Sequence, residues 1–431
     1  MQIVDTALAK RAAENKPIRV ALVGAGFAAR TSALQILTAA RGMKLVAIAN
    51  RTLSKAERAY RDGGVQDPVR VSSVADLEKS IEQGKFAVTD DPLLVCKAGQ
   101  IDAVIEATGN CEIGTEVAFE AIKNGKHVIL MSAEVDASVG PILKVYADKA
   151  GVIITYTDGD EPGVAMNLFR FVDDIGYKPV MIGQVKGFLD HYRNPDTQTE
   201  LANKLGQNPA ILASFADGSK LALEAALTGN ATGFVPQIRG MHGHKCTHVK
   251  ELLTKFQHDD FANGGLVEYT LGTSEPNTGA FVICYNDNPL KRDLMAYLKM
   301  GNGPYYCFYT PYHLPPMQVQ HSVARAVLFN DATIAPKGAP VCDSVSYAKR
   351  DLKAGEVLDG MGGFCAYGLV ERYDLCQREN FLPIAISLNC RLKHGVAKDQ
   401  PLRYSDVELP GDRLCDRLRI EQAAYFNSNA R

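Results

Sequence analysis

Residues 18–51, IRVALVGAGFAARTSALQILTAARGMKLVAIANR, decide the fold of this chain. An apolar run of strand length, Ile18–Val23, enters a G-x-G-x-x-A turn at Gly24–Ala29, and a helical pattern over Thr31–Ala40 follows. A second apolar strand, Lys44–Ala49, completes the order of strand, glycine turn, helix and strand that a dinucleotide-binding βαβ unit needs. The stretch therefore predicts a Rossmann domain, in preference to a glycine turn of purely structural use.

The small residues of the turn each have a physical reason. Gly24 allows the tight bend, Gly26 lets a pyrophosphate approach the backbone, and Ala29 lets the helix pack on the strand. The helix that follows presents free N–H groups and the positive end of its dipole to the phosphates. We therefore expect a dinucleotide to contact the backbone of Gly24, Gly26, Phe27 and Ala28.

The end of the second strand indicates which dinucleotide binds. Asn50-Arg51-Thr52 stands where an NAD-selective site usually has a carboxylate for the ribose 2′-hydroxyl. A carboxylate would repel the 2′-phosphate of NADP, whereas a guanidinium and a hydroxyl can bind it. The sequence therefore predicts NADP(H), held by Asn50, Arg51 and Thr52. The alternative is a solvated Arg51 that opens the next helix.

A second small-residue turn is predicted to lie under the cofactor. The buried strand Ile101–Ile105 ends in Glu106-Ala107-Thr108-Gly109-Asn110. Ligands of open α/β sheets bind at the carboxyl edge of the strands, and small residues let a cofactor lie close to that edge. We expect Thr108 and Gly109 to contact the nicotinamide half.

The pattern along the chain predicts an α/β fold with three domains. Helices and strands alternate as far as Val152–Tyr156, which predicts an N-terminal doubly wound parallel sheet over residues 1–155. Residues 156–338 show mixed strands and helices, typical of a central α+β domain for substrate binding and dimerisation, and residues 339–431 predict a small β-clip module. The strands of an expected antiparallel sheet in the central domain are Leu266–Leu271, Ala280–Tyr285 and Tyr305–Tyr309.

Length and composition limit the classes of partner. A chain of 431 residues suits two or three domains. The formal net charge of −2, from 47 Lys and Arg against 49 Asp and Glu, gives no bulk field that would favour nucleic acid or an acidic membrane. No apolar run approaches the roughly 18 residues of a spanning helix, and the ten cysteines include no C-x-x-C pair. These features predict a cytoplasmic protein with reduced thiols, a small-molecule substrate and no nucleic-acid or membrane partner.

Three carboxylates, Asp158, Asp160 and Glu161, directly follow the strand Val152–Tyr156. They repel one another, so we expect a cation or a proton to offset their charge. Hard oxygen ligands suit Mg²⁺ or Mn²⁺, which can hold two substrate oxygens at once. The three residues are therefore predicted as catalytic groups and metal ligands. The alternative is helix capping, with Glu161 as the cap and Pro162 as the first helical residue.

Two lysines are further candidates for catalysis. Lys186 ends the apolar strand Pro179–Gly187, and a lysine that enters a site at a strand end can polarise a carbonyl or move a proton. Lys220 and Glu224 lie one turn apart on a helix predicted over Ser219–Thr228, where they could line the substrate pocket. The alternatives are a Lys186 side chain that snorkels to solvent and a surface ion pair that contributes little to stability.

Polar stretches of the central domain predict the substrate contacts. His242-Gly243-His244-Lys245 has no H-E-x-x-H or C-x-x-C partner that would make a metal site, and a phosphate-binding loop fits the stretch as well. Asn302-Gly303-Pro304-Tyr305 and Tyr312-His313 are expected to form an aromatic, polar turn that closes the pocket. The predicted substrate residues are Arg239, His242, Lys245 and Asn302.

The central strands also predict a homodimer. Phe281–Tyr285 and Tyr306–Tyr309 carry apolar or aromatic residues on both faces, and no sequence element obviously covers the second face. Such a face would expose a larger apolar patch than monomers usually tolerate, so we expect a two-fold dimer through this sheet or the C-terminal module. The alternative is a monomer in which the tail covers the face.

The order of phrases along nearly the whole chain resembles a family of oxidoreductases related to homoserine dehydrogenase that carries a C-terminal SAF domain. Within that family the chain is similar to the 1-deoxy-D-xylulose 5-phosphate reductoisomerase-like type. The phrases that carry the resemblance are Val23–Ala29, Glu106–Asn110, Asp158–Gly163, Lys186–Asp190, Phe215–Lys220, Ala348–Gly360 and Lys393–Leu402. The resemblance implies NADPH- and metal-dependent isomerisation and reduction of a sugar phosphate, as in isoprenoid biosynthesis. It also implies that Asp158, Asp160 and Glu161 hold the metal and that basic residues of the central domain hold the phosphate.

The chain departs from the family pattern at two places. It lacks the Ser-Glu-His phrase of the standard reductoisomerases, and Ser132–Asp136 lacks the Asn-Lys of homoserine dehydrogenases. Activity on sugar acids or on homoserine-like hydroxy compounds is therefore an alternative, as is a non-catalytic cofactor-binding regulator. The acidic cluster argues against the regulator. Carboxylates that repel one another at the mouth of a site would have no evident use in a scaffold protein.

Overall fold

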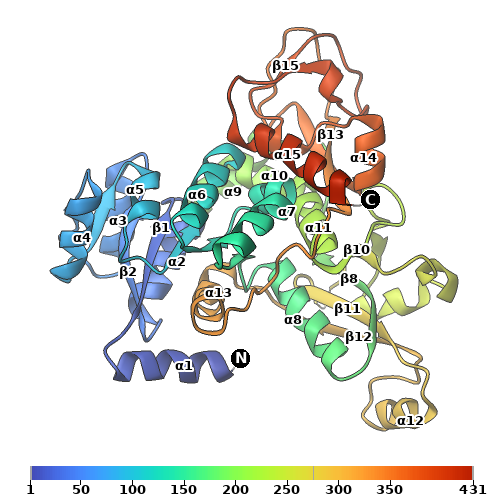
Figure 1. Ribbon diagram of the computed structural model, residues 1–431. Coiled ribbons are helices and arrows are strands. Elements are labelled where there is room, and N and C mark those ends of the chain that lie inside the picture. Colours follow the sequence, from blue (N-terminus) through green and yellow to red (C-terminus); the bar gives the residue numbers. More distant parts are fainter. Residues whose placement is uncertain (1, 275, 430–431) are drawn as a thin grey trace. The chain divides into compact units, whose positions relative to one another are not determined.

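The computed structural model describes residues 2–274 and 276–429, and Figure 1 shows its helices and strands. The chain forms two compact units, each built from segments that are distant in sequence. The first comprises Met1–Gly159, Leu314–Ala335 and Asp412–Arg431, and the second comprises Asp160–His313 and Pro336–Gly411. These units do not coincide with the predicted boundaries after residues 155 and 338, so the three-domain division stays a prediction.

The first unit contains a seven-stranded sheet with the strand order β3-β4-β2-β1-β5-β6-β7. All of its recorded pairings are parallel, which confirms the predicted doubly wound sheet. The chain order reverses at β1, which lies between β2 and β5, and ligands of such sheets bind at this switch point. Its strands are β1 (Ile18–Val23), β2 (Met43–Ala49), β3 (Val69–Arg70), β4 (Ala87–Thr89), β5 (Ala103–Glu106), β6 (His127–Leu130) and β7 (Ile154–Tyr156).

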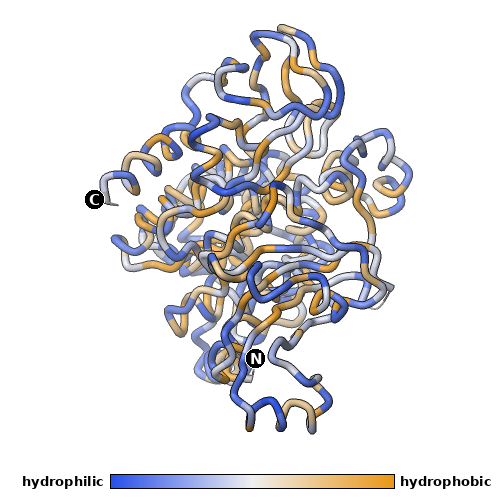
Figure 2. Tube along the Cα trace, turned by 90° about the vertical axis from the view of Figure 1, so that its right-hand side faces the viewer, coloured by the Kyte–Doolittle hydropathy of each residue, from blue (hydrophilic) through white to orange (hydrophobic). Residues whose placement is uncertain are grey.

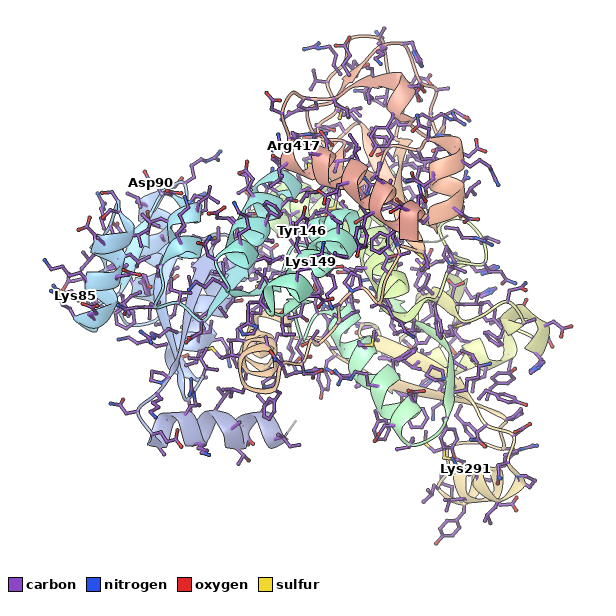
Figure 3. The ribbon with its side chains drawn as sticks, viewed as in Figure 1. Lys85, Asp90, Tyr146, Lys149, Lys291 and Arg417 are labelled. Atoms are coloured by element: carbon purple, nitrogen blue, oxygen red, sulfur yellow. The ribbon has the colours of Figure 1, made fainter. Side chains whose placement is uncertain are left out.

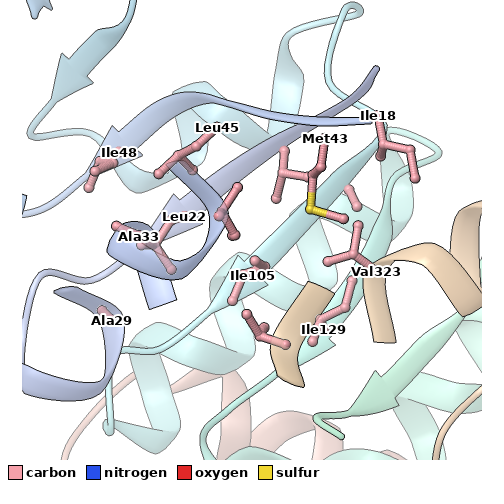
Figure 4. Close-up of a cluster of buried hydrophobic side chains, with 14 of the residues drawn as sticks. Ile18, Leu22, Ala29, Ala33, Met43, Leu45, Ile48, Ile105, Ile129 and Val323 are labelled. Atoms are coloured by element: carbon pink, nitrogen blue, oxygen red, sulfur yellow. The ribbon is translucent and has the colours of Figure 1, made fainter. Parts of the chain in front are cut away.

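Helices bury their apolar faces against this sheet. Figure 4 shows Leu22, Ile105 and Ile129 from the strands packed with Ala33 of α2 and Val323 of α13. Hydrophobic and hydrophilic residues alternate along the tube of Figure 2, and Val4 and Leu8 of α1 are buried in the same cluster. The helices of this unit are α1 (Gln2–Ala13), α2 (Phe27–Thr38), α3 (Leu53–Asp62), α4 (Val74–Glu82), α5 (Pro92–Lys97), α6 (Cys111–Lys123), α7 (Ala133–Ala150), α13 (Pro315–Phe329) and α15 (Leu414–Asn429).

The C-terminal helix α15 belongs to this first unit and packs on α6 and α7. The Tyr146 hydroxyl of α7 donates to a Glu421 carboxylate oxygen at 2.6 Å, and the Lys149 ammonium lies 5.5 Å from the Tyr425 ring centroid. Figure 3 labels Tyr146 and Lys149 on the helix that carries them. The last helix therefore groups with the nucleotide-binding sheet and not with the β-rich residues that precede it.

The second unit contains a five-stranded sheet with the strand order β12-β11-β8-β10-β9. The prediction of a purely antiparallel sheet is wrong, because β10 pairs in parallel with both β8 and β9, while β11 is antiparallel to β8 and β12. Its strands are β8 (Lys178–Lys186), β9 (His244–Lys245), β10 (Leu266–Leu271), β11 (Ala280–Tyr285) and β12 (Tyr305–Thr310). Its helices before the C-terminal module are α8 (Glu161–Asp174), α9 (Pro195–Leu205), α10 (Pro209–Ala216), α11 (Ser219–Thr232) and α12 (Pro289–Tyr297).

Both faces of this sheet are covered by other elements of the chain. Helices α8 and α11 pack on one face, and two 3₁₀ turns, Val249–Thr254 and His258–Phe261, contribute to an apolar cluster with Phe281 and Ile283 on the other. The expectation of an uncovered face is therefore wrong, because the chain between β9 and β10 supplies the missing layer. The homodimer therefore stays a prediction, and an uncovered sheet face no longer supports it.

Short strands and turns dominate residues 336–411, as predicted. Strand β13 (Cys342–Ala348) pairs antiparallel with β14 (Ala366–Arg372), and β15 (Arg391–Leu392) pairs antiparallel with β16 (Val407–Glu408). A short helix α14 (Tyr373–Glu379) follows β14 directly. The SAF assignment of this module stays a prediction.

The cysteines and the hydropathy of the helices bear on the class of protein. All ten cysteines are free thiols and buried. Within the described ranges 2–274 and 276–429, no helix combines the length and the apolarity that crossing a membrane would require.

Candidate functional site

The glycine turn of the first unit is shaped for a ligand. Gly24 has a φ of 114°, and a Cβ atom there would lie 2.5 Å from the carbonyl oxygen of Ala107. A Cβ on Gly26 would meet nothing within 4 Å. The fold therefore requires a glycine at position 24, whereas the glycine at position 26 leaves open space of the kind that a pyrophosphate fills.

The start of α2 offers backbone donors to an anion. No side chain caps this helix end, and its first turn contains no acidic residue. Phe27 is 40% exposed, and Ala28 is exposed as well. The free N–H groups and the positive end of the helix dipole thus face outward, and these residues fit the phosphates of a dinucleotide.

The turn after β5 is held in a fixed conformation beside Gly24. Both the backbone N–H and the hydroxyl of Thr108 donate to the Glu106 carboxylate, at 2.7 and 2.5 Å, and the N–H of Gly109 donates to the Ser132 hydroxyl at 3.0 Å. Burial raises the pKa of Glu106, although the Thr108 hydrogen bonds act in the opposite direction. This network fixes the surface on which the nicotinamide half is predicted to lie.

The residues after β2 leave a guanidinium free for a ligand. The Asn50 side chain donates to the Thr52 carbonyl oxygen at 2.8 Å, which orders the turn. Arg51 and Thr52 are exposed, and no ion pair of Arg51 is recorded among the described residues. The predicted 2′-phosphate contact is therefore accessible.

The second unit gathers charged side chains from four elements. Asp160 caps α8 and Glu161 is its first residue, so the capping alternative holds with the positions shifted by one residue. Lys186 ends β8, and Lys220 lies in the first turn of α11. The cluster also contains Glu224 of α11 and His313, which follows β12.

The cluster is a network of close ion pairs. The Lys186 Nζ lies 2.5 Å from a Glu161 carboxylate oxygen and 3.7 Å from one of Glu224. The Lys220 Nζ lies 3.1 Å from Glu224 and 3.5 Å from Asp160. The side chain of Glu224 is only 1% exposed, whereas that of Lys186 is 20% exposed and can meet a ligand. Snorkelling to bulk solvent is therefore not what Lys186 does.

Burial and charge set the protonation of this network. Burial raises the pKa of Glu161, and it raises that of Glu224 to about 7. Burial disfavours the Lys186 ammonium, but Glu161 and Glu224 outweigh that effect and the pKa of Lys186 is raised. Burial lowers the pKa of His313, whose Nδ1 lies 3.9 Å from Glu161. At neutral pH the site holds a protonated lysine beside a carboxyl group that titrates.

The same residues test the predicted metal site. Ligand atoms of Asp160, Glu161 and His313 lie within 4.8 Å of one another. Each acid is, however, already paired with a lysine ammonium, which offsets its charge and would repel a dication. The cluster thus fits a divalent metal poorly while both lysines are charged.

Asp158 belongs to the first unit, whereas Asp160 and Glu161 belong to the second. Its carboxylate lies 3.8 Å from the buried Arg325 guanidinium and accepts the N–H of Gly159 at 2.8 Å. Its own N–H donates to the Ser322 hydroxyl at 2.7 Å. The Asp158 carboxylate is therefore paired with protein groups. These contacts do not support its predicted role as a metal ligand.

Of the predicted substrate residues, Lys245 is placed next to the cluster. In the β8–β10–β9 register, Lys186 pairs with Leu271 and Leu271 pairs with Lys245, so the two lysines lie in the same row, two strands apart. A pocket of about 550 Å³ opens at this end of the strands. Its lining comprises Gly187, Phe188, Leu189, Lys245, Cys246, Thr247, Glu251, Leu271 and Gly272.

The other three predicted substrate residues have different surroundings. Arg239 donates to Glu371 at 2.7 Å and to the Tyr347 hydroxyl at 2.5 Å, so its guanidinium is occupied. The Nδ1 of His242 lies 2.9 Å from a Glu268 carboxylate oxygen, and that contact raises the pKa of His242.

Asn302 lies at the far end of the sheet from Lys186. Tyr285 of β11 pairs with Lys178, the first residue of β8, and with Tyr305, so the turn before β12 is beside the start of β8. Only the His313 end of the predicted pocket-closing turn joins the cluster. The sequence indicated Glu224 only as an ion-pair partner of Lys220 and His313 only as a turn residue. Their place in the site was missed because the fold, and no sequence spacing, brings them together with Glu161.

Two segments match known families of oxidoreductases. Residues 18–131 match the GFO/IDH/MocA oxidoreductase family, NAD-binding Rossmann fold, and residues 159–319 match the family described as oxidoreductase DRL, catalytic domain. The first match spans β1 to β6, and the second spans the charged cluster.

Two homoserine dehydrogenases are similar to part of the chain. That of Methylobacillus glycogenes is 33% identical over 118 residues, 26% of this chain and 24% of the relative. That of Neisseria gonorrhoeae is 30% identical over 91 residues, 20% of this chain and 21% of the relative. The chain therefore spans about a quarter of the length of these relatives or less.

Solved structures resemble the chain only distantly. The putative myo-inositol dehydrogenase of Sinorhizobium meliloti has a TM-score of 0.40 at 12% identity, covering 73% of this chain and 87% of that one. A likeness of this size supports no conclusion about chemistry. The two family matches describe segments only: one similar to the NAD-binding Rossmann fold of the GFO/IDH/MocA oxidoreductase family precedes one similar to the catalytic domain of oxidoreductase DRL.

Proposed function

We propose that this oxidoreductase uses NADP(H) to reduce a carbonyl of a small sugar or polyol phosphate, in the manner of a 1-deoxy-D-xylulose 5-phosphate reductoisomerase-like enzyme. The observation that carries the proposal is the Lys186 ammonium, which lies 2.5 Å from Glu161 at the end of β8, in the same row of the sheet as Lys245 of the pocket lining. A protonated, partly exposed lysine suits a carbonyl that gains negative charge.

The proposed chemistry assigns the proton to Lys186. NADPH, when bound at the glycine turn, would supply the hydride that the carbonyl carbon gains. The Lys186 Nζ donates a proton to the carbonyl oxygen, which becomes a hydroxyl, and Glu161 keeps the ammonium in place. In the reverse direction the same nitrogen receives the proton of the hydroxyl.

Glu224 is proposed as the proton store of the site. Its carboxyl lies 3.7 Å from Lys186, and its pKa of about 7 lets it hold a proton at neutral pH and return it to the lysine. Lys220, 3.1 Å from Glu224, limits how far burial can raise that pKa.

Lys245 is the proposed contact for the anionic end of the substrate. It is exposed in the pocket and lies two strands from Lys186, which is about 10 Å between their Cα atoms at the usual strand spacing. A substrate of a few carbons with a phosphate can span this distance. Lys245 carries the positive charge among the lining residues named above, and the nearby Thr247 hydroxyl donates to Glu251.

The test is NADPH oxidation with 1-deoxy-D-xylulose 5-phosphate, sugar acids and homoserine, each with Mn²⁺ and with a chelator. A branched polyol phosphate as product would support isomerisation before reduction. Turnover of homoserine or of a sugar acid alone would instead favour the alternative dehydrogenase. Loss of turnover with chelator would restore the predicted metal, and no turnover of any compound would favour the regulator.

A further inference from the structure

The strongest unassigned feature is a buried ion pair between the C-terminal module and the start of α11. The Lys349 Nζ, just after β13, lies 2.8 Å from the Asp217 carboxylate, and the two side chains are 4% and 0% exposed. The same nitrogen donates to the carbonyl oxygens of Arg193 and Gly363, each at 2.6 Å. The ammonium therefore has three close oxygen neighbours, one of a carboxylate and two of backbone carbonyls.

Asp217 connects Lys349 to the start of α11. One of its carboxylate oxygens accepts the N–H of Ser219 at 2.7 Å, at the point where Gly218, with a φ of 87°, turns the chain into the helix. The other oxygen is the one that meets Lys349. Lys220 follows within the same turn, so an unwinding of this first turn would move its ammonium away from Asp160 and from Glu224, one turn further along the helix.

A second contact supports the same helix end from the module. The N–H of Gly368, in β14, donates to the Ser219 hydroxyl at 2.9 Å. A Cβ on Gly368 would lie 3.2 Å from the Cα of Ser219, so the strand lies directly on the helix. Burial raises the pKa of Asp217 and Lys349 counteracts that effect, which means that the pair depends on both partners.

We infer that Lys349 is a positioning residue for the proposed reaction, which holds the start of α11 and thereby the Lys220 ammonium beside Glu224. The C-terminal module is, on this view, part of the support of the active site. The inference rests on the proposed function for its effect on rate, but its effect on Glu224 can be measured without turnover.

The experiment compares wild type with Lys349→Met and with the double variant Asp217→Asn/Lys349→Met. The first readout is the pKa of the Glu224 carboxyl, followed by ¹³C NMR of the full chain labelled at glutamate and assigned with Glu224→Gln. A displaced Lys220 should raise this pKa by about one unit in both variants. The second readout is the pH profile of kcat, which should shift in the same direction, with kcat lowered up to about 100-fold and KM nearly unchanged.

The double variant keeps the inference falsifiable where Lys349→Met alone folds poorly. It removes the unpaired buried carboxylate, and an asparagine can still accept the N–H of Ser219. A Glu224 pKa that returns to its wild-type value in the double variant would overturn the inference, because only the stranded charge would then matter. An unchanged Glu224 pKa in both variants would overturn it as well. Lys393→Met, at an exposed position of the same module, is the control and should change neither readout.

These outcomes separate the inference from the proposed function. If no compound is turned over but the Glu224 pKa moves in both variants, the proposed function fails and the positioning role stands. If turnover follows the proposal but the pKa stays, the positioning role alone fails.

Discussion

The ammonium of Lys186, at the end of β8, lies 2.5 Å from a carboxylate oxygen of Glu161, at the start of α8. Strand end and helix start meet here because α8 packs on β8 and β11. The contact supplies the cation that the acidic residues after β7 need. It thereby turns a set of repelling carboxylates into a site with a protonated lysine at its centre.

Replacing Lys186 by methionine should remove the proton donor and leave the buried Glu161 carboxylate without its ammonium partner. We expect kcat for carbonyl reduction to fall by about 10²- to 10⁴-fold, the usual contribution of a positioned acid or base. Lys178→Met, at the exposed first residue of the same strand, is the matched control and should leave kcat unchanged. Steady-state kinetics with NADPH measures both. Equal activity of the two variants would contradict the role of Lys186.

Replacing Glu224 by glutamine should change the pH dependence of the reaction. Burial raises the pKa of Glu224 to about 7, so the group is protonated below that pH and loses its proton above it. Carbonyl reduction needs the protonated form, so its rate should fall as the pH rises through about 7 in wild type. The variant cannot titrate and should lack this decline. A decline that persists in Glu224→Gln would assign it to another group.

The local pattern predicted much of the first unit and its cofactor turn. Strand β1 was predicted with its observed bounds, Ile18–Val23, because a mostly apolar run ends there at a glycine turn. The helix after that turn was predicted over Thr31–Ala40, although α2 spans Phe27–Thr38. The last residues of the glycine motif, Phe27–Ala29, form the first turn of this helix, and assigning them to the turn alone misses that start.

Long-range pairing was the part that the sequence could not predict. The strands of the second unit have the expected residues, but nothing in their pattern distinguishes a parallel from an antiparallel neighbour, so the direction of β10 was missed. In the site, Asp160, Glu161, Lys186 and Lys220 were predicted singly and lie together. The pairing of Asp217 with Lys349 joins distant segments, and no spacing rule indicates it.

Alanine substitutions at the two glycines of the cofactor turn should have opposite effects. Gly26→Ala adds a Cβ into open space, so stability should stay at the wild-type level while NADPH affinity falls at least about tenfold, or ~1.4 kcal/mol. Gly24→Ala places a side chain at a φ of 114° and against the Ala107 carbonyl, so it should cost at least about 1–3 kcal/mol of folding stability. Thermal melts and cofactor titrations measure the pair. Full NADPH affinity in Gly26→Ala would place the pyrophosphate elsewhere.

Replacing Arg51 by alanine should reduce the preference for NADPH. The exposed guanidinium can donate to a 2′-phosphate, and a hydrogen bond to a charged group contributes about 1.5–3 kcal/mol. The NADPH dissociation constant should therefore rise about tenfold or more, whereas that for NADH should not change. Lys55→Ala, at an exposed position of the next helix, is the control. Tighter NADH binding by wild type would show that the residues after β2 select NAD.

Replacing Asp136 by asparagine should stabilise the protein at high pH. Asp136 is 2% exposed within α7, and burial raises its pKa to about 7. One of its oxygens has no recorded hydrogen-bond partner. In the unfolded chain the carboxyl ionises near pH 4. Between pH 4 and about 7 the folded form therefore holds a proton that the unfolded form has lost, and the wild type loses stability as the pH rises through this window.

An asparagine at this position never ionises and avoids that loss. The free energy of unfolding of Asp136→Asn relative to wild type should increase between pH 5 and pH 8 by an amount on the order of 3 kcal/mol. Asp148→Asn, on the same helix with a side chain that is 59% exposed, should show no such increase. Denaturant unfolding at the two pH values measures both variants. A stability difference for Asp136→Asn that does not change with pH would mean that the buried carboxyl finds a charged partner, and its ionisation would then carry no cost.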